Sequence, residues 1–168
     1  TLTDSFIPTD DYLQKREASL KPCPDIWETI HRGYMPRLYQ QTVNWDVYYA
    51  SYVATYIERD VRQLANIGST SDFTRFMVAV AARSAELLNY SSVAQDAGIS
   101  MDTAKRWMAV LQASGIIHLL PPYHNSHLKR AIKTPKLYMR DTGLMAWLTK
   151  WLTPDTIRLG ARSGQFFE

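Results

Sequence analysis

The stretch SVAQDAGISMDTAKRW, residues 92–107, has the residue pattern of two helices joined by a tight turn. The small side chain of Ala94 suits a close crossing of two helices, and Gly98 permits the left-handed backbone of such a turn. Ser100 is placed to cap the second helix. The buried stripe of that helix is expected at Ala104, Trp107, Met108 and Leu111. The stretch therefore predicts a helix-turn-helix.

Further helices are predicted on the N-terminal side of this pair. Apolar residues recur at helical spacing over residues 45–66 and again over residues 73–88. The segment 25–41 begins as a helix, breaks at Gly33 and restarts near Pro36, because proline is tolerated in a first helical turn. Residues 1–24 are polar, with prolines on both sides of Cys23, and are expected to be an irregular linker.

On the C-terminal side, two short strands are predicted around a basic loop. IIHLLPP, residues 116–122, is a β-branched and apolar run ended by two prolines, and KLYMR follows at residues 136–140. Asp141 is placed to cap a last helix. Three helices followed by a two-stranded wing make a winged helix, so the expected fold is mainly α.

The positive charge is concentrated in one part of the chain. The formal net charge is +3, yet residues 101–140 contain seven basic side chains and one acidic side chain, Asp102. Because phosphate attraction follows local charge density, a nucleic-acid surface is expected in this range. The candidate contacts are Lys105 and Arg106 on the second helix and Lys129, Arg130, Lys133 and Lys136 around the wing loop.

Two observations keep a purely structural interpretation open. Asp102 lies in the first turn of the second helix, where base contacts are usually made, and its carboxylate repels phosphate. A basic helix face or loop also serves simply as a solvated surface. The same residues therefore fit a winged helix that binds no nucleic acid.

Several classes of protein are excluded or disfavoured by the sequence. With Cys23 as the single cysteine, the chain forms neither an internal disulfide nor a cysteine-built zinc site. His118, His124 and His127 are interpreted as one strand and two loop histidines, so no metal site is predicted. The patterns of a P-loop, a nucleophile elbow and an HExxH zinc site are absent from the sequence, and no catalytic residue is predicted. The apolar runs are too short to span a bilayer and no secretion signal is visible, so a soluble, cytoplasmic location is expected.

Four segments together resemble the C-terminal half of a group of prokaryotic AAA-like P-loop ATP-binding proteins whose C-terminal part is a domain of unknown function. The segments are RGYMPRL (residues 32–38), YIERDVRQL (56–64), residues 87–123 and residues 133–148. The family order is a P-loop ATPase, a helical lid, a winged helix and a restriction-endonuclease-like domain. This order implies a linker at 1–24, a lid-like region at 25–68, a winged-helix domain at 69–150 and the start of a truncated nuclease-like domain at 151–168.

The resemblance also implies a larger parent protein. It implies that the parent is an ATPase using ATP and Mg²⁺, with no cofactor held by this chain itself. It places Gly33, Pro36 and Arg37 in a nucleotide-contacting lid, with Arg37 facing the phosphates. The implied partners are the ATPase domain of the same protein, DNA and a second copy of the chain, with no membrane. Two functions stay open, namely nucleic-acid contact through the basic wing and a protein-interaction or oligomerisation module without DNA binding.

Overall fold

The computed structural model describes residues 9–18, 25–40, 43–56, 69–123 and 134–168, which form a mainly helical protein with a small antiparallel sheet. The helices before the predicted helix-turn-helix are α1 (Asp10–Ala18), α2 (Ile26–Arg32), α3 (Arg37–Gln40), α4 (Trp45–Tyr56) and α6 (Thr70–Ala82). The later helices are α7 (Tyr90–Ala97), α8 (Met101–Ala113), α10 (Thr142–Leu148), α11 (Pro154–Leu159) and α12 (Ser163–Phe167). No helix within these described ranges is long and apolar enough to cross a membrane.

The helix pair α7–α8 follows the local signals of the sequence closely. Gly98 ends α7 in the left-handed conformation, with φ 69° and ψ 37°, and its N–H donates to the Ala94 and Gln95 carbonyls. The Ser100 side chain accepts a hydrogen bond from the Thr103 N–H and caps α8. The predicted stripe is buried as expected at Ala104, Trp107, Met108 and Leu111.

The sheet has three strands in the order β1–β3–β2. The two predicted strands are confirmed as β2 (Ile117–Leu120) and β3 (Lys136–Met139), which pair antiparallel with Ile117 opposite Met139. β1 (Glu86–Leu87) pairs with the other edge of β3, with Glu86 opposite Leu137. The helical pattern expected over residues 73–88 is wrong at its end, because α6 stops at Ala82 and Glu86 and Leu87 form β1. A strand of two residues is too short to show an alternating pattern in the sequence.

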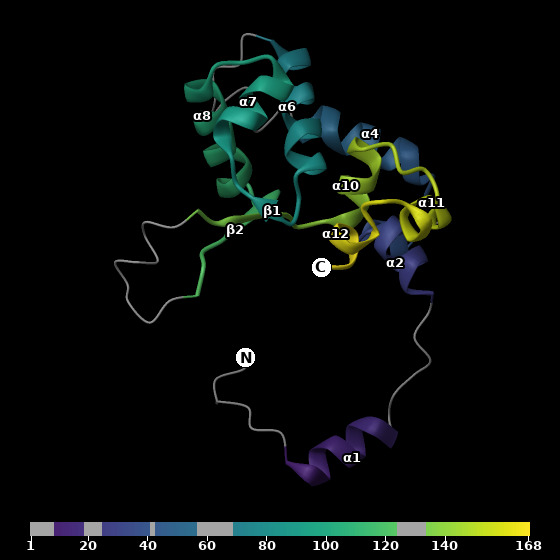
Figure 1. Cartoon of the computed structure of the whole chain (residues 1–168). Helices are drawn as coiled ribbons and strands as arrows, with labels where there is room; N and C mark the ends of the chain where they lie inside the picture. The colour runs from purple at the N-terminus through teal and green to yellow at the C-terminus, as the bar shows by residue number, and fades with distance from the viewer. Residues whose placement is uncertain (1–8, 19–24, 41–42, 57–68, 124–133) are drawn as a thin grey trace.

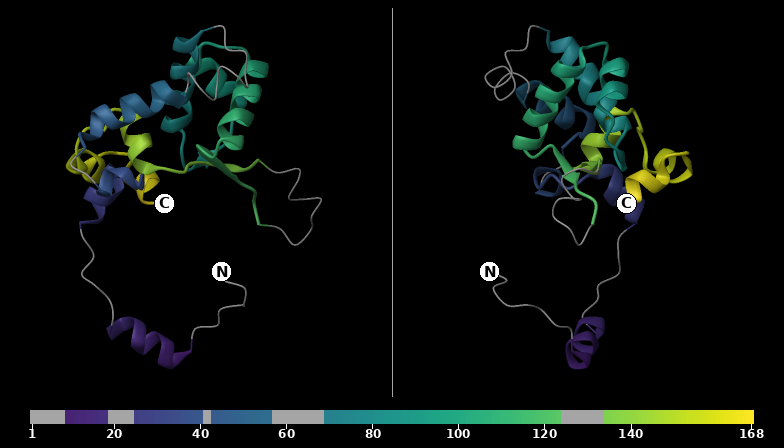
Figure 2. Two further views of the ribbon diagram at one scale, coloured as in Figure 1. Left: turned by 180° about the vertical axis from the view of Figure 1, so that it is seen from behind. Right: turned by 60° about the vertical axis from the view of Figure 1, so that its left-hand side comes forward.

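The core is continuous across two groups of helices. Figures 1 and 2 show α6, α7 and α8 together at one end of the molecule and α2, α4, α10, α11 and α12 at the other, with the sheet running along the base of the α6–α8 group. In the first group, the Trp107 ring packs edge-on against Phe73 and Phe76, with ring centroids 5.1 and 5.5 Å away. α10 packs on α2, α4 and α6 and so joins the two groups.

The structure differs from the expected organisation in the N-terminal segment. Residues 10–18, expected to be irregular, form helix α1, which buries none of its side chains. The helix expected over residues 45–66 is present as α4 up to Tyr56, and residues 57–68 lie outside the described part of the chain.

The C-terminal residues pack on the body of the protein. In α11 and α12, Ile157 and Phe166 are buried, and the Trp151 ring packs edge-on against Phe166. α11 also packs on α2. Residues 151–168 thus share the core of the helices before them.

Candidate functional site

The outer face of α8 is exposed along its whole length. Since its other face is buried against α6 and α7, the side chains left in solvent are Met101, Asp102, Lys105, Arg106, Ala109 and Gln112. Lys105 and Arg106 are therefore both exposed to solvent. Within the described residues, neither side chain forms an ion pair.

A hollow of about 480 Å³ lies beside the turn that precedes α8. Arg106 and Trp107 line it together with Ser69, Asp72 and Thr103. Trp107 Nε1 is buried and has no hydrogen-bond acceptor among the described residues. The Arg106 guanidinium thus lies at the edge of a polar depression formed by the start of α6 and the α7–α8 turn.

Of the other predicted cationic contacts, one forms an ion pair within the protein and three lie outside the described residues. Lys136, on β3, forms an ion pair with the Glu168 carboxylate, which also accepts a hydrogen bond of 2.6 Å from the Tyr138 hydroxyl. The hydrogen bond between the two side chains raises the pKa of Lys136 and lowers the pKa of Glu168. Lys136 is thus engaged by a carboxylate that a phosphate would have to displace. Lys129, Arg130 and Lys133 lie outside the described residues.

The three lid residues do not converge on one cavity. Gly33 is buried at the end of α2 with φ 81°, and a Cβ there would lie 2.3 Å from the Tyr49 hydroxyl oxygen. Pro36 and Arg37 are exposed, and Arg37 begins the short helix α3. Gly33 therefore serves close packing, whereas Pro36 and Arg37 are the members of the set that another molecule can reach.

Asp141 caps α10, as the sequence predicts, and also holds two distant segments. Its Oδ1 accepts hydrogen bonds from the Leu144 N–H at 2.6 Å and from the Tyr49 hydroxyl at 2.7 Å. Its Oδ2 accepts from the Tyr34 N–H at 2.7 Å. Burial, followed by the nearby Asp141 charge, strongly raises the pKa of Tyr49 and keeps its hydroxyl protonated as a donor. Asp141 thus fixes Tyr34, which follows α2, to α4 and α10.

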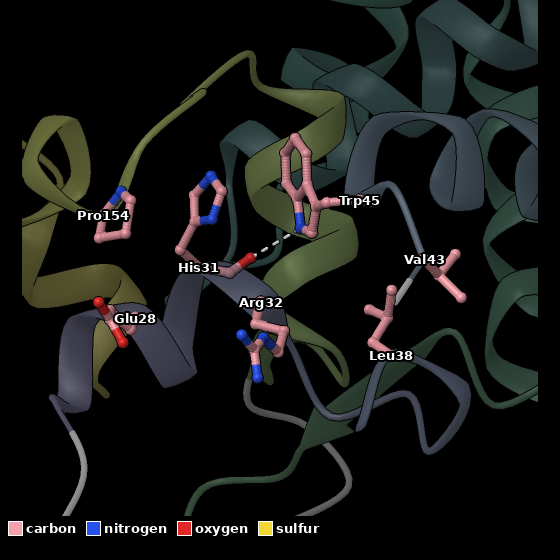
Figure 3. Close-up of a pocket in the computed structure, with 7 residues that line it drawn as sticks. All are labelled: Glu28, His31, Arg32, Leu38, Val43, Trp45 and Pro154. Carbon is pink, nitrogen blue, oxygen red and sulfur yellow. Dashed lines mark hydrogen bonds between the residues drawn. The ribbon is translucent and has the colours of Figure 1, made fainter. Parts of the chain in front are cut away.

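The sequence did not predict the pocket shown in Figure 3. It has a volume of about 400 Å³ and is lined by Glu28, His31, Arg32, Leu38, Val43, Trp45 and Pro154. The His31 ring stacks on Trp45 with centroids 4.4 Å apart, and Trp45 Nε1 donates to the His31 carbonyl at 3.0 Å. A histidine and an aromatic residue 14 positions apart carry no spacing signal, so only the packing of α2 on α4 reveals this pair.

The His31 imidazole is held in its neutral form by its surroundings. Burial lowers its pKa, and this effect outweighs the opposing influence of the Trp151 and Leu152 backbone. Its Nε2 is buried without a hydrogen-bond partner among the described residues. At the opening of the pocket, Glu28 and Arg32 are exposed and supply charges of both signs.

No described group of three His, Cys, Asp or Glu side chains could hold a metal ion. His118 is exposed on β2, and His124 and His127 lie outside the described residues. The described surfaces that can engage a partner include the α8 face, the exposed residues Pro36 and Arg37, and the pockets.

Comparison with known proteins places the chain in a family. A family described as "Domain of unknown function (DUF8612)" matches residues 23–155, and the chain belongs to this family. It is 28% identical over 116 residues to the uncharacterized protein Mb2031c of Mycobacterium bovis and, equally, to the uncharacterized protein Rv2008c of Mycobacterium tuberculosis. Each match covers 68% of this chain and 26% of the relative, so the chain spans about a quarter of the length of these curated relatives. No solved structure matches the chain.

Proposed function

We propose that the chain is the lid and winged-helix portion of an ATP-binding protein and that it contacts nucleic acid without catalysing a reaction. The observation that carries the nucleic-acid part is the exposure of Lys105 and Arg106 on the outer face of α8. Two adjacent cations on a helix that follows a tight turn are suited to phosphate contact.

The order of the elements supports the winged-helix assignment. The helices α6, α7 and α8 are followed by the antiparallel strands β2 and β3, and β1 after α6 completes the sheet. The loop between β2 and β3 contains Lys129, Arg130 and Lys133, which makes it the second basic element of the proposed interface.

The proposed mode of binding is contact with the backbone rather than base reading. Asp102, in the first turn of α8, is exposed and repels phosphate where a recognition helix usually meets base edges. Lys105 and Arg106 lie one turn further along and are free of ion pairs with the other described residues. Binding is therefore expected to depend strongly on salt and weakly on sequence.

The ATP-binding part of the proposal rests on the resemblance of the segments and on the exposed lid residues. Pro36 and Arg37 are accessible to a neighbouring ATPase domain, which would supply the site for ATP and Mg²⁺. In that arrangement Arg37 would approach the phosphates and offset their charge.

A protein-interaction module is the second candidate function, and one surface favours it. Leu87, Leu120 and Tyr123 are 66%, 47% and 86% exposed, and they line a groove of about 430 Å³ at the end of the sheet. Exposed apolar side chains gathered in one place are typical of interaction sites. This candidate predicts oligomerisation, or binding of a protein partner, in the absence of DNA.

The test is binding of a fluorescent duplex DNA to the full chain, followed by anisotropy at several salt concentrations. In the variant Lys105→Glu/Arg106→Glu, we expect the binding constant to fall about tenfold or more. The plot of log binding constant against log salt concentration should become less steep by about two, since two phosphate contacts are lost. The matched control is Lys15→Glu/Arg16→Glu, which makes the same charge change on α1, where no side chain is buried.

Two results would count against nucleic-acid contact through α8. One is the absence of duplex binding by the wild type at low salt, and the other is an equal loss in the α8 and α1 variants. Sedimentation of the wild type without DNA then examines the second candidate function, for which a dimer or larger species is expected.

A further inference from the structure

A second cleft, with a volume of about 180 Å³, lies where the segment between α2 and α3, helix α4 and the start of α10 meet the turn after α8. Tyr34 and Tyr52 line it, together with Gly115 and Arg140. Tyr34 is 57% exposed, so its aromatic ring is accessible at the cleft wall. Tyr52 is half-buried, and its ring stacks on the rings of Tyr48 and Tyr56.

Arg140 supplies the exposed positive charge of this cleft. Its side chain is exposed, and no acidic residue of the described part of the chain pairs with it. The backbone N–H of Arg140 donates a hydrogen bond to the Ile116 carbonyl at 3.0 Å, and this bond holds the residue beside the turn after α8. Gly115 has φ 74°, and a Cβ there would lie 3.4 Å from Arg140 Nη1, so the glycine lets the guanidinium lie against the backbone.

The carboxylate of Asp141 also borders the cleft but is occupied by protein donors. Both of its oxygens accept hydrogen bonds, from the Tyr34 N–H, the Tyr49 hydroxyl and the Leu144 N–H, and the residue is 7% exposed. The charge that the cleft presents to solvent is therefore the guanidinium of Arg140.

Tyrosine rings beside an arginine suit a ligand with a planar aromatic group and an anionic group. Aromatic side chains stack on nucleobases of any sequence, and the planar guanidinium matches two phosphate oxygens at once. We propose that this cleft binds one nucleotide unit, with the base stacked on the exposed ring of Tyr34 and the phosphate on Arg140.

A nucleic-acid strand and a free nucleotide share this chemistry. The strand as source rests on the proposed function, because α8 leads from the exposed Lys105 and Arg106 to Gly115 at the cleft. Ala113, the last residue of α8, is seven positions beyond Arg106, which corresponds to about 10 Å of helical rise, and Gly115 follows two residues later. A strand lying along α8 would thus reach the cleft with one of its bases.

The test follows the amide signals of the isotope-labelled full chain by NMR during titration with deoxythymidine monophosphate and, separately, with a five-residue oligothymidylate. Saturable shifts are expected at the amides of Gly115, Ile116, Arg140 and Leu144. Arg140→Ala should weaken binding about tenfold, because the charge-assisted phosphate contact is lost. Tyr34→Ala should weaken it about fivefold or more, whereas Tyr34→Phe keeps the stacking ring and should bind like the wild type.

The spectra of the variants also report whether they are folded, so a loss of binding is separable from a loss of structure. Tighter binding of the oligonucleotide supports the strand as the source, and equal or tighter binding of the mononucleotide supports the free nucleotide. The proposal is overturned if neither ligand gives saturable shifts at these amides, or if Arg140→Ala leaves the affinity unchanged.

The result of the nucleotide titration is distinguishable from the result of the duplex experiment, because the bases of a duplex are paired and not available for stacking on the cleft. Mononucleotide binding in the cleft without duplex binding would reject the α8 interface alone. Duplex binding that depends on Lys105 and Arg106, without any shift in the cleft, would reject the cleft alone.

Discussion

Asp141 accepts hydrogen bonds from three donors that lie far apart in the sequence. These are the Leu144 N–H in its own helix, the Tyr34 N–H and the Tyr49 hydroxyl. A buried carboxylate is stable only when it is well paired with donors, so each of these bonds offsets part of its desolvation. At this scale one side chain both begins a helix and joins it to two other segments.

Removal of the Tyr49 hydroxyl should therefore destabilise the protein. In Tyr49→Phe the ring stays in the core while a buried donor to Asp141 is lost, and we expect the free energy of unfolding to fall by about 1–3 kcal/mol. Urea denaturation measures this change. Tyr34→Phe is the control, because Tyr34 is 57% exposed and its substitution should shift stability by less than about 0.5 kcal/mol. An unchanged urea midpoint for Tyr49→Phe would show that Asp141 does not need this donor.

At the scale of the element, the α7–α8 pair is specified almost entirely by neighbouring residues. Asn89 and Ser100 cap the two helices through side chains that accept hydrogen bonds from N–H groups three residues later. Gly98 supplies the left-handed residue between the helices. Because each of these signals acts within a few residues, the position of the pair could be predicted from the sequence.

The turn itself can be tested by substitution of Gly98. A Cβ at this position would lie 3.9 Å from Arg75 Nη2, an ordinary contact, so the cost of Gly98→Ala is conformational and is expected to be about 1 kcal/mol. Gly98→Asn should cost less, because asparagine adopts the left-handed conformation more readily. Thermal denaturation followed by circular dichroism compares the two variants. Equal losses in both would indicate that backbone conformation is not the cause.

At the scale of the whole molecule, the end of α2 and the start of α10 cross in close contact. A Cβ on Gly143 would lie 2.3 Å from the Tyr49 hydroxyl oxygen and 2.5 Å from the Arg32 carbonyl oxygen. One of these atoms belongs to the backbone of α2, which cannot move aside as a flexible side chain can. The close packing of α2 on α10 therefore depends on the absence of a side chain at Gly143.

Gly143→Ala should accordingly be destabilising, although alanine is the better helix former. We expect a loss of about 1–3 kcal/mol from overpacking, measured by urea denaturation. The matched control is Gly164→Ala in α12, where a Cβ would have nothing within 4 Å, so its stability should be unchanged or slightly higher. If Gly143→Ala were as stable as the control, a Cβ at this position would fit between α2 and α10, contrary to the close contact in the structure.

The sequence by itself determined the elements whose signals are local. Helical spacing placed α6, α7 and α8, the Ser100 cap marked the start of α8, and two apolar runs placed β2 and β3. It also placed the exposed cations of α8, because the same periodicity that buries Trp107 turns Lys105 and Arg106 outward.

Only the tertiary structure decided which distant residues meet. It showed the pairing of β1 with β3, the stacking of His31 on Trp45 and the ion pair of Lys136 with Glu168. It also showed that Gly33 serves packing against α10 and that Asp141 holds Tyr34 and Tyr49. The hydrogen bond between Tyr34 and Asp141 joins residues that are 107 positions apart in the chain. Such contacts arise from how helices pack rather than from any spacing within one segment. For that reason the mainly helical character, the helices α6–α8 and the strands β2 and β3 could be predicted from patterns along the chain, while the cleft and the pockets became visible only once the elements were packed together.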